Sequence, residues 1–124
     1  MTSTIGEQPA SGISTVVSPE RSTIVLVGEI DAALREQASA SMAAALTSGL
    51  PIVVDATRAS FIDSSGIAFV LQLHLAAAES GLRLTLLDPS RVVRDVLDMV
   101  GVPGIEDEAP AALVDDEAPA PLSA

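Results

Sequence analysis

Hydrophobic and polar residues follow two different patterns along the first half of the chain. The segments ISTVV (13–17) and TIVLVGEI (23–30) are rich in Val, Ile and Thr, and the turn-forming sequence SPERS lies between them, which is typical of a β-hairpin. Residues 32–49 instead carry apolar side chains at the spacing of an amphipathic helix. Asp31 is a suitable cap for this helix and Gly49 a suitable stop. The first half therefore predicts an antiparallel hairpin followed by one helix.

Strands and helices alternate through the second half. PIVVDA (51–56) is short and almost wholly apolar, as a strand buried on both faces of a parallel sheet is. A helix is expected over 67–80, because the apolar residues there again follow a helical spacing and Gly81 provides a stop. LRLTLLD (82–88) indicates another strand. This alternation predicts parallel strands joined by helical crossovers.

The segment DPSRVVRDVLDMVG (88–101) predicts a third helix, with Asp88 or Ser90 as its cap and Gly101 as its end. Its apolar stripe consists of Val93, Val96, Leu97 and Val100. The order of elements is β-β-α-β-α-β-α, which gives an α/β fold class. We therefore expect a single domain with a sheet of about four to five mostly parallel strands, an antiparallel edge hairpin, and helices packed against the sheet.

Composition divides the chain into three parts. Residues 1–12 are small and polar and are expected to form a loose leader, and residues 13–105 carry the strand and helix patterns of the folded domain. Residues 106–124 form an acidic tail rich in Pro and Ala, in which DEAPA occurs at 107–111 and again at 116–120. Low-complexity segments of acid and proline favour disorder, so we expect this tail to be a disordered, solvated extension.

Composition and charge exclude several classes of function. The chain of 124 residues has a net charge of -11 and all of its basic residues are Arg, so it repels nucleic acid. It has no Cys, and therefore no thiolate metal site or cysteine nucleophile. Its first residues lack the basic start and apolar run of a signal peptide, and no apolar segment is long enough to span a bilayer. We therefore expect a cytoplasmic protein that binds neither nucleic acid nor membrane.

The stretch FIDSSGIAF (61–69) places an acid, two hydroxyls and a glycine between apolar residues. A catalytic serine would need a histidine base within reach. The single histidine, His74, follows Ser65 by nine residues on the same expected helix, which is about 13 Å at a rise of about 1.5 Å per residue. No G-x-S-x-G motif is present either. Hydrolase activity is therefore not expected.

His74 falls within the apolar stripe expected for the second helix. That stripe consists of Ile67, Val70, Leu71, Leu75 and Ala78. Nothing in the spacing of the sequence supplies His74 with partners for a metal ion. We therefore interpret it as a histidine at or near the core, with its nitrogens satisfied.

Three interpretations of the polar residues remain. A helix start binds anions, but the chain has no Lys, no G-x-x-x-x-G-K-[ST] and no G-x-G-x-x-G, which makes a nucleotide cradle a weak candidate. Asp63, Ser64 and Ser65 are each good helix caps, although capping explains one of them and not three in a row. A hydroxyl in the first helical turn is also exposed to a modifying enzyme, and a phosphate there would add about −1.5 to −2 charges. The residues alone leave capping and modification both open.

Three segments of the chain share the order and spacing of a known family's motifs. SFIDSSGIAFVL contains Asp-Ser-Ser-Gly between apolar residues, and LVGEID (26–31) ends a strand in Gly-Glu-Ile-Asp. LTLLDPSRVVRDVLDMVGV (84–102) ends a strand-helix unit in a Gly-apolar pair. Together they resemble the STAS family of anti-sigma factor antagonists. The resemblance covers about residues 13–105 and implies that this part of the chain is a STAS-like domain.

The resemblance implies a switch that works by binding and is not an enzyme. Unphosphorylated members bind an anti-sigma factor serine kinase and thereby release a sigma factor. Phosphorylation ends this binding, and a PP2C-type phosphatase reverses the modification. By motif position the phosphorylated residue is Ser65, with Ser64 as the second choice. Asp31 and Asp63 match the acids beside that site, and Gly66 lets a partner approach the helix start. No cofactor of the protein's own is implied.

Phe69 and Leu73 lie to one side of the expected core stripe, one and two turns from Ser65. They are either core residues or, if exposed, an apolar patch suited to a partner. With them, the expected partner-binding residues are Asp31, Asp63, Ser64, Gly66, Phe69 and Leu73.

Two other functions stay open. One is a STAS binding module with a different partner, such as a signalling scaffold or a lipid-transport subunit. The other is a small-ligand or nucleotide-binding domain, against which the absence of Lys and of a glycine-rich loop speaks. The apolar face of a small domain leaves a monomer or a weak dimer as the expected oligomeric state.

Overall fold

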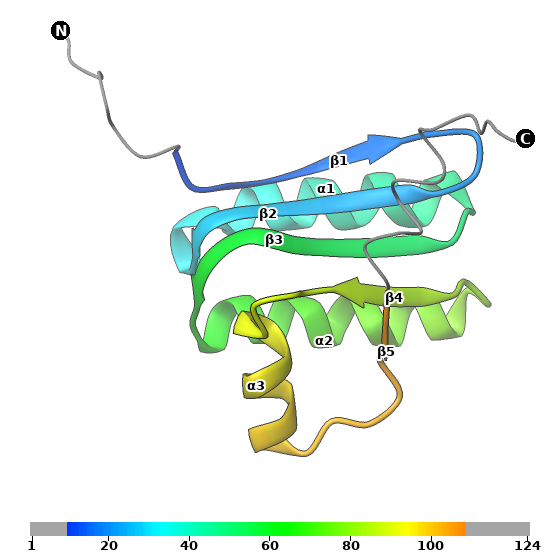
Figure 1. Ribbon diagram of the computed structural model, residues 1–124. Coiled ribbons are helices and arrows are strands. Elements are labelled where there is room, and N and C mark those ends of the chain that lie inside the picture. The colour runs from blue at the N-terminus through cyan, green and yellow to red at the C-terminus, as the bar shows by residue number, and fades with distance from the viewer. Residues whose placement is uncertain (1–9, 109–124) are drawn as a thin grey trace, which may run out of the picture.

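Runs of β-branched and other aliphatic residues form a five-stranded sheet in the computed structural model, which describes residues 10–108. The strands lie in chain order: β1 (Gly12–Val17), β2 (Ser22–Ile30), β3 (Ile52–Ile62), β4 (Leu84–Leu87) and β5 (Glu106–Asp107). β1 pairs antiparallel with β2, and each later pair is parallel (Figure 1). The predicted α/β fold with an antiparallel edge hairpin is therefore confirmed.

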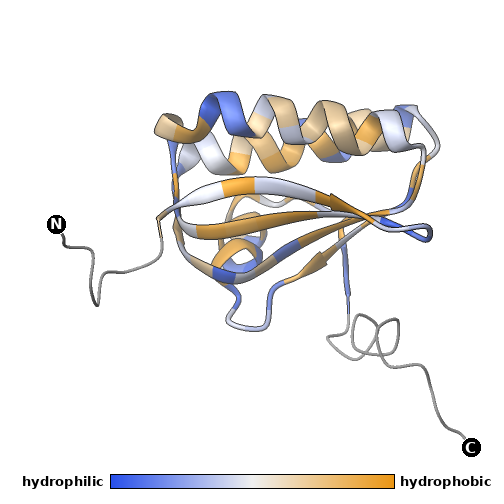
Figure 2. Cartoon of the chain, turned by 90° about the horizontal axis from the view of Figure 1, so that it is seen from above, coloured by the Kyte–Doolittle hydropathy of each residue, from blue (hydrophilic) through white to orange (hydrophobic). Residues whose placement is uncertain are grey.

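The crossovers between the parallel strands are helical. They are the 3-10 helix η1 (Ala32–Leu34) followed by α1 (Arg35–Ser48), then α2 (Ser64–Glu79) and α3 (Val92–Val100). α1 and α2 lie side by side along one face of the sheet, whereas α3 lies below β4 in Figure 1 (Figures 1 and 2). Since η1 and α1 follow β2 and α2 follows β3, these helical segments begin at the edge where the two parallel strands end.

Much of the core lies between the sheet and the layer of α1 and α2, where the apolar stretches of strands and helices meet (Figure 2), and α3 adds the fully buried Val93 and Leu97 to it. β2 alternates buried and partly buried residues, with Ile24, Leu26 and Ile30 fully buried. All four residues of β4 are buried, as expected for a strand inside a parallel sheet. Gly49 ends α1 with a φ of +69°, a left-handed conformation that glycine adopts without steric cost. The predicted stop of this helix is therefore confirmed.

β3 is longer than the sequence predicts. A strand over 51–56 was expected, but β3 continues to Ile62. Its second half carries exposed polar residues such as Thr57 and Arg58, and its pairing with β2 shifts register twice. Such irregularities break the two-residue alternation by which a strand is recognised in a sequence. The strand therefore carries the chain further toward the start of α2 than expected.

The buried face of α2 is turned relative to the predicted stripe. Phe69 and Leu73 are buried, whereas Leu75 is 62% exposed and Ala78 is exposed as well. The helix begins near the sheet at the buried Gly66, so the residues three and seven positions further on face inward. The assignment of Leu75 and Ala78 to the core is therefore wrong, because the sequence does not reveal which turn of the helix touches the sheet.

Asp88 caps α3. Its carboxylate accepts hydrogen bonds from the backbone N–H groups of Val92, Val93 and Arg94 at 3.1, 2.9 and 2.7 Å. The alternative cap, Ser90, is exposed. Three amides on one carboxylate satisfy most of the donors that a helix start leaves unpaired. Of the two predicted caps, the structure therefore selects Asp88.

The folded domain extends slightly past its predicted end. β5 pairs parallel with β4, and Nη2 of Arg94 donates to Oδ1 of Asp107 and to the carbonyl of Ile105, both at 2.7 Å. The first two residues assigned to the acidic tail thus belong to the sheet, because backbone pairing and an ion pair hold them. The rest of the predicted tail, 109–124, and most of the predicted leader, 1–9, lie outside the described residues.

Candidate functional site

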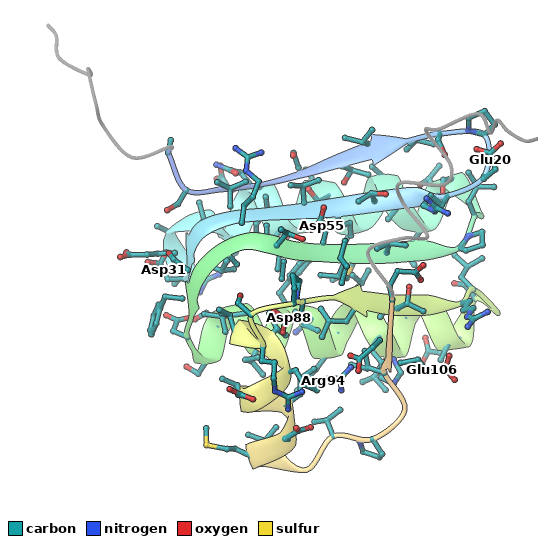
Figure 3. The ribbon with its side chains drawn as sticks, in the orientation of Figure 1. Glu20, Asp31, Asp55, Asp88, Arg94 and Glu106 are labelled. Carbon is teal, nitrogen blue, oxygen red and sulfur yellow. The ribbon has the colours of Figure 1, made fainter. Side chains whose placement is uncertain are left out.

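The C-terminal ends of β2 and β3 meet at one edge of the sheet. β2 leads into Asp31 and β3 leads into Asp63, and the N–H of Asp63 donates a hydrogen bond to the carbonyl of Ile30 at 3.1 Å. This bond ties the start of α2 to the end of β2. Figure 3 shows Asp31 at this end of the molecule. Open α/β sheets bind their ligands at such an edge, so the fold brings the predicted acids and serines together where a site is expected.

Asp63 is the N-cap of α2. Its backbone is extended, its Oδ1 accepts a hydrogen bond from the N–H of Gly66 at 3.0 Å, and its carbonyl accepts one from the N–H of Ile67 at 2.9 Å. A side-chain cap of this kind stabilises a helix by about 1 kcal/mol. Capping therefore explains Asp63, and it leaves Ser64 and Ser65 unexplained.

The two serines of the motif have no structural task in the part of the chain that the structure describes. Within residues 10–108, neither the Ser64 nor the Ser65 hydroxyl takes part in a hydrogen bond. Ser64 is exposed, and Ser65 is half-buried in the first turn of α2. The first turn of a helix also carries unpaired amides and the positive end of the helix dipole, both of which favour an anion. The site can therefore accommodate a negatively charged group on either hydroxyl.

Gly66 serves the packing of α2 against the sheet. A Cβ atom at this position would lie 2.5 Å from Cγ1 of Ile62 and 2.8 Å from the carbonyl oxygen of Ile30. Real Cβ atoms do not approach other atoms so closely, so only glycine fits without a shift of the helix. The interpretation that Gly66 opens the helix start to a partner is therefore wrong. Its hydrogen faces the interior, and it fixes where Ser65 stands at the edge of the sheet.

Asp31 holds the turn between β2 and the first helical segment. Its Oδ1 accepts a hydrogen bond from the N–H of Ala33 at 3.0 Å, and its carbonyl accepts one from the N–H of Leu34 at 3.0 Å. The side chain is half-buried, so its charge remains at the surface beside the start of α2. The predicted capping role of Asp31 is confirmed, and its contact with a partner stays a prediction.

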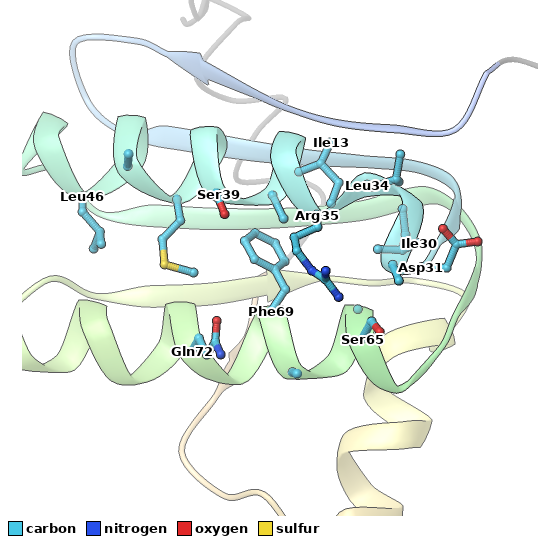
Figure 4. A pocket seen from close by; sticks show the side chains of 16 residues that line it. Ile13, Ile30, Asp31, Leu34, Arg35, Ser39, Leu46, Ser65, Phe69 and Gln72 are labelled. Carbon is cyan, nitrogen blue, oxygen red and sulfur yellow. The ribbon is translucent and has the colours of Figure 1, made fainter.

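A groove of about 540 Å³ runs between α1 and α2. Its floor is apolar and includes the buried side chains of Leu34, Ala38 and Phe69. Ser65 lines one end of the groove, and the side chain of Arg35 extends toward that end from α1 (Figure 4). The candidate site is thus continuous with an apolar groove that the sequence did not predict.

Phe69 and Leu73 belong to the core. Leu73 is fully buried and Phe69 is 6% exposed. Of the two roles that the sequence left open, the partner-contacting patch is therefore wrong for Leu73, which no partner reaches without unfolding of α2. Phe69 contributes to the floor of the groove and presents no apolar patch at the surface.

Phe61 is the exposed aromatic residue at this edge, and sequence reasoning missed it. It is 53% exposed and pairs in register with Glu29 of β2, whereas the next residue, Ile62, is buried. Successive side chains of a strand point to opposite faces. Because β3 extends over both residues, Phe61 points to solvent and Ile62 to the core. The alternation of the two residues is a signal that could have identified Phe61, had the strand been expected to continue there.

Within residues 10–108, no three carboxylate or imidazole side chains gather closely enough to hold a metal ion. His74 is half-buried and lines a separate shallow pocket with Leu82 and Gly104. No helix of these residues is both long and apolar enough to cross a membrane.

A family model and two solved structures at 30% identity indicate one family. The family model described as Mlab, STAS domain, matches residues 13–114. The chain is 30% identical to the anti-sigma factor antagonist SpoIIAA in its unphosphorylated form, with a TM-score of 0.66 over 85% of this chain and 95% of that one. The phosphorylated form of SpoIIAA, a Bacillus cell fate determinant, matches at 30% identity with a TM-score of 0.65 over 85% of this chain and 98% of that one.

A third solved structure supports the fold. An anti-sigma factor antagonist from Mycobacterium paratuberculosis is 15% identical, with a TM-score of 0.68 over 82% of this chain and 90% of that one. A search of curated protein sequences finds no match. The family and the fold therefore rest on the domain model and on solved structures.

Proposed function

The chain belongs to the STAS-domain family of anti-sigma factor antagonists, and on that premise we propose that it is a phosphorylation-controlled switch of sigma factor activity. The unphosphorylated protein binds an anti-sigma factor serine kinase in the cytoplasm, and this binding releases the sigma factor. Phosphorylation of Ser65 ends the binding, and a PP2C-type phosphatase restores it. The protein works by binding and is not an enzyme, since the kinase supplies the Mg-ATP.

The difference between the capping acid and the two serines of the motif supports this proposal. Asp63 alone caps α2, while the hydroxyls of Ser64 and Ser65 form no hydrogen bond within residues 10–108. Two hydroxyls without a structural role, at the exposed start of a helix, suit a kinase that must reach one of them. We place the phosphate on Ser65 because of its position in the motif, and Ser64 is the second choice.

Mapping of phosphopeptides by mass spectrometry tests the proposal. Wild type, Ser65→Ala and Ser64→Ala are incubated with extract of the source cells and Mg-ATP. We expect phosphate on Ser65 in the wild type and in Ser64→Ala, and none in Ser65→Ala. Both substitutions remove a hydroxyl that forms no hydrogen bond within the described residues, so both variants are expected to fold and differ only in the acceptor.

Two other results have definite meanings. Phosphate on Ser64 in the wild type and in Ser65→Ala, and none in Ser64→Ala, would support the switch with Ser64 as its phosphorylated residue. An extract that phosphorylates a control substrate and leaves both serines unmodified would contradict the proposal. A constitutive binding module would then be the better account.

We further propose that Phe61 contacts the kinase partner. Its ring is 53% exposed on β3, and the carboxylates of Glu29, Asp31 and Asp63 lie on the elements around it. An aromatic residue within a charged rim is the usual composition of the centre of a protein interface. The exposed ring implies that the matching surface of the kinase has an apolar pocket for it.

Truncation of this ring tests the contact. Phe61→Ala is expected to weaken binding to the purified kinase by about 10- to 100-fold, as loss of an interface aromatic does. The free energy of unfolding should change little, because the ring is largely exposed. Calorimetric titration and urea denaturation measure the two quantities.

Leu75→Ala is the matched control. Leu75 is 62% exposed and lies on α2, two to three turns away from Ser65. The substitution removes a similar exposed apolar side chain outside the proposed interface, so we expect the affinity for the kinase to stay unchanged. Equal weakening by both substitutions, or none by Phe61→Ala, would remove Phe61 from the interface.

A further inference from the structure

The groove between α1 and α2 is elongated. On one side it is lined from Leu34 at the end of η1 to Leu46 of α1, which is about 18 Å at a rise of about 1.5 Å per residue. Its volume of about 540 Å³ lies within the range of small-molecule sites, about 300–1,000 Å³. The groove is therefore of a size that suits a small elongated ligand.

Small side chains on the two facing helices create this space. Ala38 and Ala43 of α1 and Gly66 and Ala68 of α2 are among the residues that line it. Along its floor the groove is apolar and mostly buried, which favours a hydrocarbon occupant.

Arg35 supplies a charge at one end of this groove. Within residues 10–108 it forms no ion pair, although Arg83, Arg91 and Arg94 each do. A cation in the first turn of a helix is opposed by the helix dipole, so its own helix gives Arg35 no electrostatic support. Figure 4 shows its guanidinium directed across the groove toward the start of α2. An anion at this end would give the guanidinium a partner.

Asp31 is the other charged residue that lines the groove, and it does not cancel this site. Its carboxylate accepts a hydrogen bond from the N–H of Ala33 and lies beyond Ile30, at the far right of the view in Figure 4, away from the guanidinium of Arg35. An anionic group that pairs with Arg35 therefore lies closer to the guanidinium than to the carboxylate of Asp31, so attraction exceeds repulsion.

We propose that the groove binds a single-chain amphiphile with a carboxylate head, such as a fatty acid. The carboxylate pairs with Arg35, and the alkyl chain lies along Ala38, Met42 and Leu46. Because Ser65 lines the same end of the groove, the bound head covers its hydroxyl. This last consequence rests on the proposed function, in which an occupied groove would slow the phosphorylation of Ser65.

Titration of the unmodified full chain with octanoate, decanoate and dodecanoate, each below its micellar concentration, tests the proposal. We expect the dissociation constant to fall by up to about fourfold for each added methylene, since the chain leaves water as it binds. Amide resonances of α1 and α2 that line the groove should shift. No kinase is present, so the outcome does not depend on whether Ser65 is phosphorylated in cells.

Two pairs of variants locate the ligand. Ser39→Trp fills the groove from its exposed rim and should abolish binding, whereas Ala40→Trp places the same bulk on the neighbouring exposed position outside the groove and should not. Arg35→Gln should lower the affinity for the carboxylates by up to about fivefold, as expected for loss of an exposed ion pair, and leave the affinity for decanol unchanged. Arg58→Gln, an exposed arginine outside the groove, should change neither.

Three results would overturn the proposal. They are affinities that do not depend on chain length, resonance shifts that map away from α1 and α2, and equal binding by Ser39→Trp and Ala40→Trp. Equal weakening of decanol and decanoate by Arg35→Gln would overturn the placement of the carboxylate.

Discussion

The phosphorylated protein is expected to bind its anti-sigma factor kinase at least about 100-fold more weakly than the unmodified protein does. A phosphate on Ser65 adds about −1.5 to −2 charges at the edge of the sheet, where Asp31 and Asp63 already carry two. In the proposed complex this dianion would have to leave water at the interface with the kinase. Burial of an unpaired charge costs several kcal/mol, which is enough to end the binding without any change of fold.

The fold itself should tolerate the charge. A negative group in the first turn of α2 interacts favourably with the helix dipole and with the amides that the cap leaves unpaired. We therefore expect Ser65→Asp, which adds one charge, to unfold at the same denaturant concentration as the wild type or at a slightly higher one. A loss of binding in this variant would then report on the interface and not on stability.

Calorimetric titration of the kinase with the unmodified, phosphorylated and Ser65→Asp proteins measures the effect. Thr57→Glu is the control, because Thr57 is exposed on β3 and the substitution adds the same single charge away from Ser65. The control should change the affinity by less than about threefold, as a screened surface charge does. If the phosphorylated protein bound within that same range, the proposed switch would be refuted.

Local chemistry explains why the order of elements could be predicted from the sequence. The carboxylate of Asp63 reaches an amide three residues away, and the left-handed Gly49 ends α1 within one turn, so each signal lies next to the element that it bounds. Such a cap or stop involves only residues within one helical turn, so tertiary packing does not alter it. The same reasoning found Asp88 as a cap of α3, although Ser90 remained an equal alternative until the geometry was known.

The contents of the site depend on packing that the sequence does not show. Whether Phe69 or Phe61 is exposed is decided by the register of β3 on β2, which shifts twice, and by the turn of α2 that touches the sheet. A shift of one residue in a strand moves every side chain to the opposite face. The groove depends on the distance between two helices that belong to separate crossovers, and no short segment contains that information. The groove was therefore beyond prediction, and Phe61 could be predicted only once the length of β3 was expected, whereas Asp31, Asp63 and the serines could be predicted from local sequence.

Gly66→Ala is expected to lower the free energy of unfolding by about 2–3 kcal/mol, although helix propensity alone predicts a gain of about 1 kcal/mol. The added methyl would lie 2.5 Å from Cγ1 of Ile62 and 2.8 Å from the carbonyl oxygen of Ile30. The second contact is with backbone that also accepts the hydrogen bond from Asp63, so it has no side chain to move aside. The helix start would have to lift from the sheet, and that hydrogen bond would weaken. The sign of the change therefore distinguishes packing from propensity.

Urea denaturation of Gly66→Ala beside Ser64→Ala measures this difference. Ser64 is exposed two positions earlier in the same helical turn, so its replacement should change the stability by less than about 0.5 kcal/mol. A Gly66→Ala variant as stable as the wild type would mean that the start of α2 can move outward at little cost. Ser65 would then not be held at a fixed place, and the kinase would have to select one of several positions of the helix. A large loss would instead show that the start of α2 packs against the sheet at a fixed distance that only glycine allows.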